Sequence, residues 1–429
     1  MVVAALIAVS FAGGAVWTRL RLPPYQWLKG QFNKLENSSD SGLGFTRFEA
    51  RDKPLSARQR AEFARLNSLG YLGSVEIGRG AGVTVYNKEL AYPGLNLSTE
   101  GYAPEATLMD MSGNVIHRWH LSLSVVFPEL KGRVSAIHRF WRRMHLLKDG
   151  SLLAIFEGRS LVKIDRDSKL VWAYNQGVNH DLEVQSDGSI YCLARRVEVI
   201  PSFYPRMPVA HDFVVILDAN GREKRRISIL NALRRSRYAN LLQRAKPYGD
   251  ILHTNTLEVL HGTPDGFPPF REGNILLSFP EINTIAVLDP DAEKIVWALT
   301  DLTVFQHQPT VVGGKNLLVF DNQGDHGRSR VLEIDPATQQ LLWSWSNKDG
   351  SLRSKTNGSV QRLPNGNTLI TESNQGRVIE VTKDHRIVWE YYSSHRAGEN
   401  NELISQVFEM IRLPADFPLD WARRGPGGE

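Results

Sequence analysis

Short apolar runs and polar turns alternate along the chain beyond residue 80, and the same unit recurs. The stretches LLKDGSLLAIFEGRSLVKIDRDSKLVWAY from Leu146 and RLPNGNTLITESNQGRVIEVTKDHRIVWEY from Arg362 share a turn pair, an apolar strand, a polar break, a second strand, a turn and Val-Trp. Turn pairs such as Asp149-Gly150 and Asn365-Gly366 suit tight β-hairpins. The apolar runs between the turns, for example NILLSF, are typical of strands buried on both faces.

We count six copies of this unit, of which the first keeps only its second half and the third is degenerate. Five copies close on a tryptophan at the equivalent position: Trp119, Trp172, Trp297, Trp343 and Trp389. Four short strands in a unit of about 45 residues are typical of a propeller blade. No helical segment separates the strands, which excludes a stack of βαβ units. The sequence therefore predicts an all-β fold, a six-bladed β-propeller over residues 81–415.

Two segments of this region depart from the repeat. Residues 228–250 combine spaced leucines with basic residues, which predicts a short amphipathic helical insertion between the third and fourth blades. We expect it to cover a blade edge or the mouth of the funnel, with contact to anionic lipid or a partner as the alternative. Residues 404–414 predict a strand that returns to complete the ring, and residues 416–429 a C-terminal tail.

The N-terminal part of the chain has a different character. Residues 2–17 are apolar and uncharged, and Arg19 and Arg21 follow them. Residues 1–22 therefore predict a signal anchor or a cleaved signal peptide, with a buried core helix as a third option. Either of the first two implies an extracytoplasmic, periplasmic body, membrane-anchored if the segment is retained. Residues 23–80 read as a spacer with one short helix, because Ser56 and Gln59 have capping-box spacing.

Net charge and cysteine content argue against some classes of partner and site. The formal net charge of +5 comes from scattered basic clusters without an aromatic-interleaved basic face, which argues against nucleic acid as a partner. Cys192 is the only cysteine, so the sequence excludes an intramolecular disulfide and a metal site built from several cysteines.

Residues at one offset from each hairpin should form a ring, because the innermost strand of every propeller blade lines a central channel. Arg142 and His180 lie eight positions before a turn glycine, and His307 lies eight positions before Lys315 of the Gly-Gly turn. The sixth copy offers Asn357 beside Gly358. An alignment of ILHTNTLEVL with VNHDLEVQ adds His253.

We therefore expect His180, His253 and His307 to converge in one polar pocket. Ordinary structural histidines are the alternative, and a zinc site with an open position is another. No acidic residues that would support metal ligands are apparent, so we expect no metal.

Several motifs together resemble one known family. They are GVTVY, ATLMDMSGNVIHRWH, NHDLEV, HTNTLEVL, QHQPTVVGGKNLLVFDNQGD, SRVLEIDP and GSVQRLPNGNTLITES, spread over residues 82–392. In these, the chain resembles the aryl-sulfate sulfotransferases of the bacterial arylsulfotransferase (ASST) type. The resemblance implies a six-bladed propeller that moves a sulfuryl group from a phenolic sulfate donor to a phenol acceptor, independently of PAPS and without a cofactor.

The resemblance also implies roles for individual residues. His307 matches the family's nucleophile, which forms a sulfohistidine. His253 and Asn255 match an HxN motif that binds the sulfate, and His180 matches another pocket histidine. A neutral imidazole divides one difficult transfer into two steps, and the donor's oxygens need positive charge nearby.

One departure from the family pattern concerns the sulfate clamp. The family carries an arginine in the fourth blade where this chain has Pro280, followed by Glu281. Loss of a bidentate cation and gain of a carboxylate weaken anion binding. Arg142 and Arg328 are the candidates to supply that charge from neighbouring blades, and Asn357 is a further candidate to bind substrate.

Two alternative functions follow from these departures. The first is a catalytically inactive propeller that serves as a binding module or membrane-complex subunit, with a protein partner on its face. The second comes from VLDPDAEKIVW and EIDPATQQLLW, which resemble the tryptophan-docking repeats of pyrroloquinoline quinone dehydrogenases. Those enzymes usually have eight blades, and no acidic set suited to calcium is evident here, so we expect no quinone cofactor.

Overall fold

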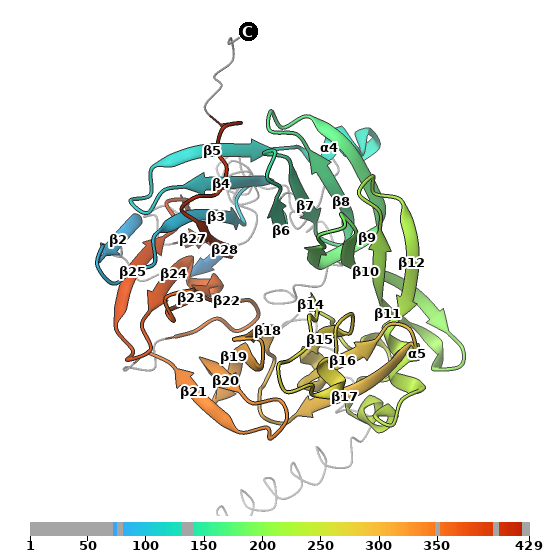
Figure 1. Ribbon diagram of the computed structural model, residues 1–429. Coiled ribbons are helices and arrows are strands. Elements are labelled where there is room, and N and C mark those ends of the chain that lie inside the picture. Colours follow the sequence, from blue (N-terminus) through green and yellow to red (C-terminus); the bar gives the residue numbers. More distant parts are fainter. Residues whose placement is uncertain (1–71, 75–79, 131–139, 348–351, 398–402, 423–429) are drawn as a thin grey trace, which may run out of the picture. The chain divides into compact units, whose positions relative to one another are not determined.

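The computed structural model describes residues 72–74, 80–130, 140–347, 352–397 and 403–422. The predicted signal anchor and the spacer helix lie outside these residues. Within the described part, no helix is both long enough and apolar enough to span a bilayer. The described strands form largely antiparallel sheets arranged as a ring (Figure 1). An all-β, propeller-like fold was predicted and is confirmed.

Four sheets of the ring have the four or five strands of a separate blade. The first joins β28 (Val407–Pro414), β3 (Gly94–Glu100), β4 (Glu105–Met109) and β5 (Val115–His120). The second joins β14 (Thr256–Val259), β15 (Ile275–Phe279), β16 (Thr284–Asp289) and β17 (Lys294–Thr300). The third joins β18 (His307–Val312), β19 (Asn316–Asp325), β20 (Arg328–Ile334) and β21 (Leu341–Trp345). The fourth joins β22 (Ser359–Arg362), β23 (Thr368–Glu372), β24 (Arg377–Val381), β25 (Ile387–Tyr392) and β2 (Gly82–Tyr86).

The remaining arc is one eight-stranded sheet, so the prediction of six separate blades is wrong. Its strands are β6 (Trp141–Leu146), β7 (Leu152–Phe156), β8 (Arg159–Ile164), β9 (Leu170–Val184), β10 (Ile190–Ile200), β11 (Tyr204–Leu217) and β12 (Glu223–Ser228), with β13 (Gly249–Asp250) paired to β11. The second and third repeats merge because β9 runs unbroken: most of its first half pairs with β8 and its second half with β10. A small separate sheet joins β1 (Leu72–Ser74), β27 (Leu403–Ser405) and β26 (Arg396–Ala397).

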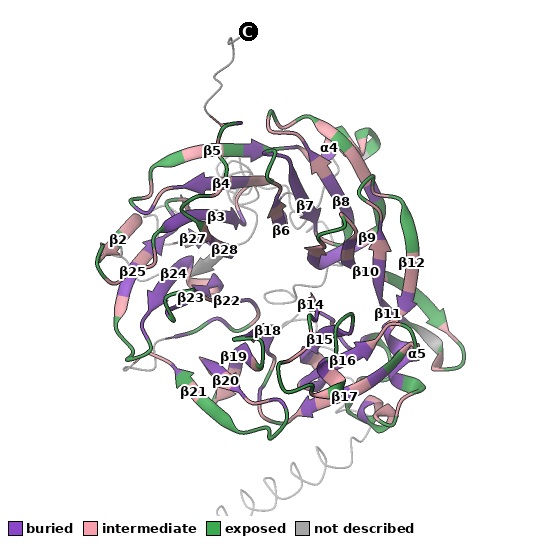
Figure 2. Cartoon of the chain, viewed as in Figure 1, coloured by how far each residue is buried: buried purple, intermediate pink, exposed green. Residues whose placement is uncertain are grey.

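Apolar cores lie between neighbouring sheets of the ring, as Figure 2 shows by the buried colour along the central strands. Leu276, Val287 and Trp297 of one sheet belong to the same buried cluster as Leu317 and Leu332 of the next. Strands β7 and β15 are buried at every position, which confirms the expectation for unbroken apolar runs. Face-to-face burial of such strands is the main stabilising term of the fold.

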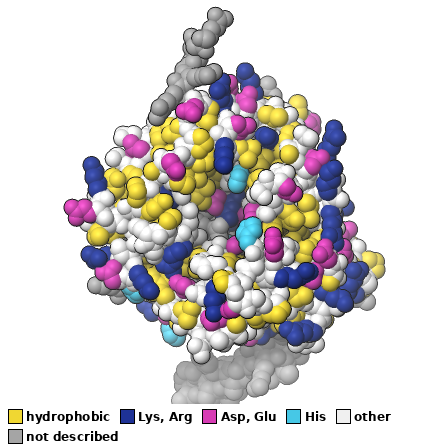
Figure 3. Space-filling view, in the orientation of Figure 1, with side chains coloured by type: hydrophobic (Ala, Val, Ile, Leu, Met, Phe, Trp, Pro, Cys, Tyr) yellow, Lys and Arg dark blue, Asp and Glu magenta, His cyan; other side chains and the backbone are white. Residues whose placement is uncertain are grey.

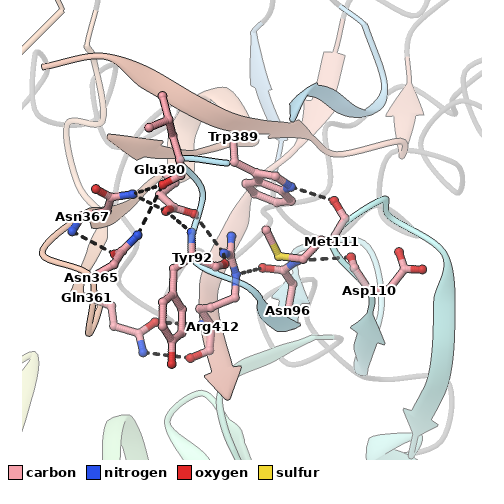
Figure 4. Close-up of polar contacts among 11 residues, drawn as sticks. Tyr92, Asn96, Asp110, Met111, Gln361, Asn365, Asn367, Glu380, Trp389 and Arg412 are labelled. Atoms are coloured by element: carbon pink, nitrogen blue, oxygen red, sulfur yellow. Dashed lines mark hydrogen bonds and ion pairs between the residues drawn. The ribbon is translucent and has the colours of Figure 1, made fainter. Parts of the chain in front are cut away.

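The ring closes where the two ends of the repeat region meet. As predicted for residues 404–414, β28 returns to pair with β3, and β2 pairs with β25 of the last sheet. The junction buries an ion pair in which Arg412 Nη1 lies 2.9 Å from Glu380 Oε2 (Figure 4). Arg412 Nε also donates to Asn96 Oδ1 at 2.7 Å, and Glu380 Oε1 accepts the Tyr92 N–H at 2.7 Å. We call these four residues the closure cluster.

Helices within the described ranges are short. They are α4 (Leu123–Val126), α5 (Ile229–Arg234) and the 3₁₀ turns η1 (Pro128–Leu130), η3 (Ala239–Arg244), η4 (Pro268–Phe270), η5 (Pro280–Ile282) and η6 (Ser373–Gln375). Residues 228–250 thus contain α5 and η3, whose Leu230, Leu233 and Leu241 join a buried core cluster. The basic side chain of Lys246 pairs with Glu281 at 2.7 Å. The insertion therefore covers apolar surface of the propeller.

Candidate functional site

Backbone irregularities set the positions of the candidate side chains. The pairing register of β6 breaks between Trp141 and Met144, and that of β9 between Asn179 and Leu182. Further breaks follow His307 in β18 and Val407 in β28. Such bulges redirect side chains that a regular strand would send to alternate faces. The space-filling view shows basic, acidic and histidine side chains gathered around a central hollow of the ring (Figure 3).

His180 of β9 and His253, which lies between β13 and β14, contact each other directly. Their Nε2 atoms lie 3.1 Å apart, and the rings meet edge to face with centroids 4.7 Å apart. Both residues have left-handed backbones, with φ of 55° for His180 and 54° for His253. A conformation that is costly for residues with a side chain is typical of functional sites, where the surroundings hold it in place.

Each of these two histidines has a carboxylate on its other ring nitrogen. Glu157 Oε1 lies 2.9 Å from His180 Nδ1, and its Oε2 accepts the His180 N–H at 3.0 Å. Asp250 Oδ2 lies 2.5 Å from His253 Nδ1 and 3.1 Å from Arg195 Nη1. The sequence analysis found no acidic support for the histidines, and that expectation is wrong. Glu157 comes from the end of the second repeat's apolar strand, and only sheet packing brings it to His180.

His307 is held by a side-chain amide. Its Nδ1 lies 2.9 Å from Asn322 Oδ1 and 3.2 Å from the Phe305 carbonyl oxygen. Asn322 Nδ2 donates to the carbonyl oxygens of Ser354 and Asn357, at 2.5 and 2.9 Å. Because the Asn322 NH₂ group faces two acceptors, its Oδ1 must face His307 and accept a proton from Nδ1.

The neutral His307 ring therefore carries its proton on Nδ1 and a lone pair on Nε2. Among the described residues, Nε2 has no hydrogen-bond partner, although the side chain is buried. Burial and the charge of Arg142, with smaller effects of His253 and His180, lower the pKa of His307 well below its usual range. A buried, unprotonated imidazole nitrogen with no partner is a candidate nucleophile.

The pKa values of His180 and Glu157 are shifted by their surroundings. Burial lowers the pKa of His180 to about 4, despite the opposing charge of Glu157. Burial would raise the pKa of Glu157, but His180 and Arg142 lower it to about 2. At neutral pH, therefore, Glu157 is ionised and the His180 ring is neutral, in a site that keeps strongly perturbed groups together.

The other predicted site residues fall into two groups. The Arg142 guanidinium lies 4.9 Å above the Phe408 ring, and its charge acts on His307 and His180. Asn255 Nδ2 donates to the Gln306 carbonyl oxygen at 3.0 Å, immediately before His307. Asn357 supports Asn322, as described above. In contrast, Arg328 pairs with Asp325 at 3.2 Å in the β19–β20 hairpin, and none of its described contacts reaches the three histidines.

Pro280 and Glu281 lie in η5, directly after β15. Pro280 is buried, and the Glu281 carboxylate is held by Lys246 of the insertion at 2.7 Å. The extra carboxylate that was expected to repel an anion is thus partly neutralised by a cation from residues 228–250.

On three inner strands, the residue directly after Arg142, His180 or His307 belongs to a second set of interacting side chains. Arg143, Asp181 and Gln308 directly follow Arg142, His180 and His307. Arg143 Nε donates to Asp181 Oδ1 at 2.8 Å, and Arg143 Nη1 contacts Gln308 Oε1 at 3.0 Å and Glu409 Oε1 at 2.5 Å. We call Arg143, Asp181, Gln308 and Glu409 the arginine layer. The sequence analysis did not predict the arginine layer. The consecutive Arg142-Arg143 pair was the feature of the sequence that could have indicated it.

A cavity of about 260 Å³ lies between three inner strands of the ring. Gln308 and Glu409 of the arginine layer belong to its wall, together with side chains of β18, β22 and β28 such as Thr310, Gln361 and Arg412. The three histidines do not line it. Within the described ranges, no group of three or more His, Cys, Asp or Glu side chains has a metal-binding arrangement.

Comparison with solved structures gives distant similarities only. The ring resembles a Bacteroides caccae protein of unknown function (TM-score 0.48, 9% identity, 74% of this chain and 98% of the other). It also resembles the WD40 β-propeller domain of Doa1 (TM-score 0.41, 10% identity, 79% and 96%) and a streptogramin B lyase (TM-score 0.42, 11% identity, 77% and 89%). No curated protein matches the chain significantly.

The family comparison is more specific. The family model described as Arylsulfotransferase (ASST) matches residues 143–394, a span that includes His180, His253 and His307. Since this match covers more than half of the 429 residues, the chain belongs to the arylsulfotransferase (ASST) family, as its motifs predicted.

Proposed function

We propose that this protein transfers a sulfuryl group from a phenolic sulfate ester to a phenol acceptor through a sulfohistidine at His307. The Nε2 lone pair of His307 attacks sulfur, the bond from sulfur to the phenolic oxygen breaks, and the first phenol leaves. The acceptor oxygen then attacks the sulfohistidine, and the sulfur–nitrogen bond breaks. Two easier steps replace one direct transfer.

The hydrogen bonding of His307 carries this proposal. Asn322 accepts the Nδ1 proton at 2.9 Å, so the ring offers an unprotonated Nε2. The low pKa of His307 keeps that nitrogen available at neutral pH. Asn322 orients the His307 ring and fixes its tautomer, as the orienting residue does for the histidine of a catalytic triad.

Charge and proton transfer fall to the neighbouring side chains. Arg142 supplies positive charge for the sulfate oxygens, and Asn255 holds the loop that ends at His307. The His180–His253 pair is suited to give a proton to the leaving phenolate and to take one from the acceptor, because their Nε2 atoms lie 3.1 Å apart. Glu157 and Asp250 hold the two rings from behind.

The N-terminus leads to a finer proposal. We propose that residues 1–22 anchor the protein in the membrane with its propeller on the extracytoplasmic side. Fractionation of cells that produce the full chain and a chain lacking residues 1–22 tests the anchor.

Pro280 favours a second candidate function, a propeller that binds a partner protein without catalysis. The family's arginine is missing at this position, and a clamp that cannot hold sulfate would leave only a binding surface. This candidate predicts purified protein that never exchanges sulfate between aryl sulfates and phenols.

The decisive experiment follows nitrophenol release from 4-nitrophenyl sulfate with phenol as acceptor. We expect release by the wild type, loss with His307→Ala, and unchanged release with His120→Gln, a matched change at an exposed histidine. Intact-mass analysis without acceptor should show one added sulfuryl group on the wild type only. Equal rates for wild type and His307→Ala would overturn the nucleophile assignment.

A further inference from the structure

Arg143 is a buried cation that touches three other strands at the centre of the ring. It starts from β6 and reaches Asp181 of β9, Gln308 of β18 and Glu409 of β28. Only 16% of its side chain is exposed, against 2% for Asp181 and 4% for Glu409. Burial opposes the charge, but Asp181 and Glu409 outweigh it, so the pKa of Arg143 is raised.

The acceptors of Arg143 directly follow the proposed catalytic histidines. Asp181 follows His180, and Gln308 follows His307. Each is also held from another side: Asp181 Oδ2 accepts the Leu257 N–H at 2.8 Å, and the Gln308 N–H donates to Thr256 Oγ1 at 3.0 Å. Movement of either residue would move the adjacent imidazole.

The backbone at both places is strained. His180 has φ of 55° and Gln308 has φ of 43°, both in the left-handed region that residues with a Cβ rarely adopt. Such conformations are unfavourable and persist only where surrounding contacts enforce them. The planar fork of Arg143 contacts the side chain of Gln308 and the side chain next to His180.

We propose that Arg143 is a positioning residue that fixes His307 and His180 by clamping the residue after each. This inference rests on the proposed function for its catalytic consequence, though the positioning itself does not. A lysine retains the charge but presents its donors from a single nitrogen, so it cannot reproduce the separate contacts of Arg143 Nε with Asp181 and of Nη1 with Gln308 and Glu409. Arg143→Lys should therefore displace the histidines while the ring remains folded.

The test compares Arg143→Lys with Arg412→Lys, a matched change at the buried arginine of the closure cluster. We expect Arg143→Lys to lower kcat about 100-fold, with KM for 4-nitrophenyl sulfate changed less than about threefold, as for a small misplacement of reacting groups. Arg412→Lys should lower the melting temperature while kcat, measured well below that temperature, stays at the wild-type value.

A second readout does not depend on catalysis. With ¹⁵N-labelled histidine, the Nδ1–H resonance of His307, hydrogen-bonded to Asn322, should shift or broaden in Arg143→Lys and be unchanged in Arg412→Lys. If Arg143→Lys fails to fold, Gln308→Met removes only the contact beside His307 and should reduce kcat about tenfold.

The possible results distinguish failure of the positioning role from failure of the proposed function. Wild-type kcat together with an unchanged His307 resonance in the folded Arg143→Lys or Gln308→Met variant would overturn the positioning role. If the wild type itself transfers no sulfuryl group, the proposed function fails, and the resonance alone then decides whether Arg143 positions His307.

Discussion

Two regions of this ring bury an arginine against a carboxylate, and they do so in opposite ways. In the closure cluster, the side chains of Arg412 and Glu380 are both fully buried, and they link β28 of the first sheet to β24 of the last. In the arginine layer, Arg143 meets its partners at bulges, and Glu409 Oε2 has no partner among the described side chains. Burial raises the pKa of Glu409 to about 7 even though Arg143 opposes the shift.

The comparison shows that groups that stabilise the fold and groups suited to chemistry lie in different parts of the ring. The closure cluster satisfies both oxygens of Glu380 and fixes the seam between the first and last sheets, although Arg412 Nη2 has no partner among the described residues. The centre of the ring instead keeps strained backbones, perturbed pKa values and an unpartnered His307 Nε2. Groups held in unfavourable states by the surrounding structure are typical of functional sites.

The strongest way to test the comparison is to break the closure cluster. Arg412→Met leaves Glu380 buried without its cation, which costs about 3–5 kcal/mol for a buried pair. We expect urea unfolding to show that loss of stability, while sulfuryl transfer below the transition keeps its kcat. A large loss of kcat in the folded variant would contradict the division between the two regions.

The matching change at the centre is Asn322→Leu. It removes the acceptor that holds the His307 proton on Nδ1, so the ring can adopt the tautomer without a free Nε2. We expect kcat to fall about 100-fold, since loss of a tautomer-fixing partner lowered a serine protease by still more. Nitrophenol release gives the rate, and the ¹⁵N shifts of His307 report the tautomer; unchanged shifts would contradict this explanation.

The inner strands also predict a pH dependence of stability. Glu258 of β14 accepts the Val311 N–H at 3.1 Å, and burial raises its pKa from 4.5 to about 7. The folded protein therefore binds this proton more tightly than the unfolded chain, so the stabilisation is complete below about pH 4.5 and is lost as pH rises to about 7.

Glu258→Gln, which mimics the protonated acid, should not lose this stabilisation. The variant should gain about 2 kcal/mol on the wild type between pH 4.5 and pH 8, less than the full shift because Glu258 is partly exposed. Urea unfolding of both proteins at several pH values measures the gap. A gap that is constant with pH would show that Glu258 does not titrate in this range.

The smallest expected effect concerns the sulfate clamp. Arg142→Gln should raise KM for the aryl sulfate, because the charge of Arg142, which acts on His307 in the wild type, is lost. Pro280→Arg in the same chain restores a cation at the position where the family carries one, and we expect it to recover about tenfold in kcat/KM, or about 1.4 kcal/mol. The single Pro280→Arg variant serves as the control. An unchanged KM in Arg142→Gln would remove Arg142 from the clamp, and absence of recovery would show that a cation at position 280 does not replace it.

The repeat, its turns and its buried strands could be predicted because they depend on local patterns. Alternation of apolar runs and turn pairs such as Asn365-Gly366 fixes hairpins whatever the surroundings. The count of separate blades was wrong for the opposite reason. Whether β9 breaks between repeats depends on its pairing with β8 and β10, which no local pattern records.

The candidate site divides in the same way. The offsets from the hairpins and the family motifs selected His180, His253 and His307 from the sequence alone. Only the tertiary structure decided that Asn322 fixes the His307 proton, that Glu157 and Asp250 support the other two rings, and that Arg143 spans the centre. Most of these contacts join residues far apart in the chain, within one sheet or between two, and their geometry depends on bulges and on packing around the ring, which sequence periodicity does not record.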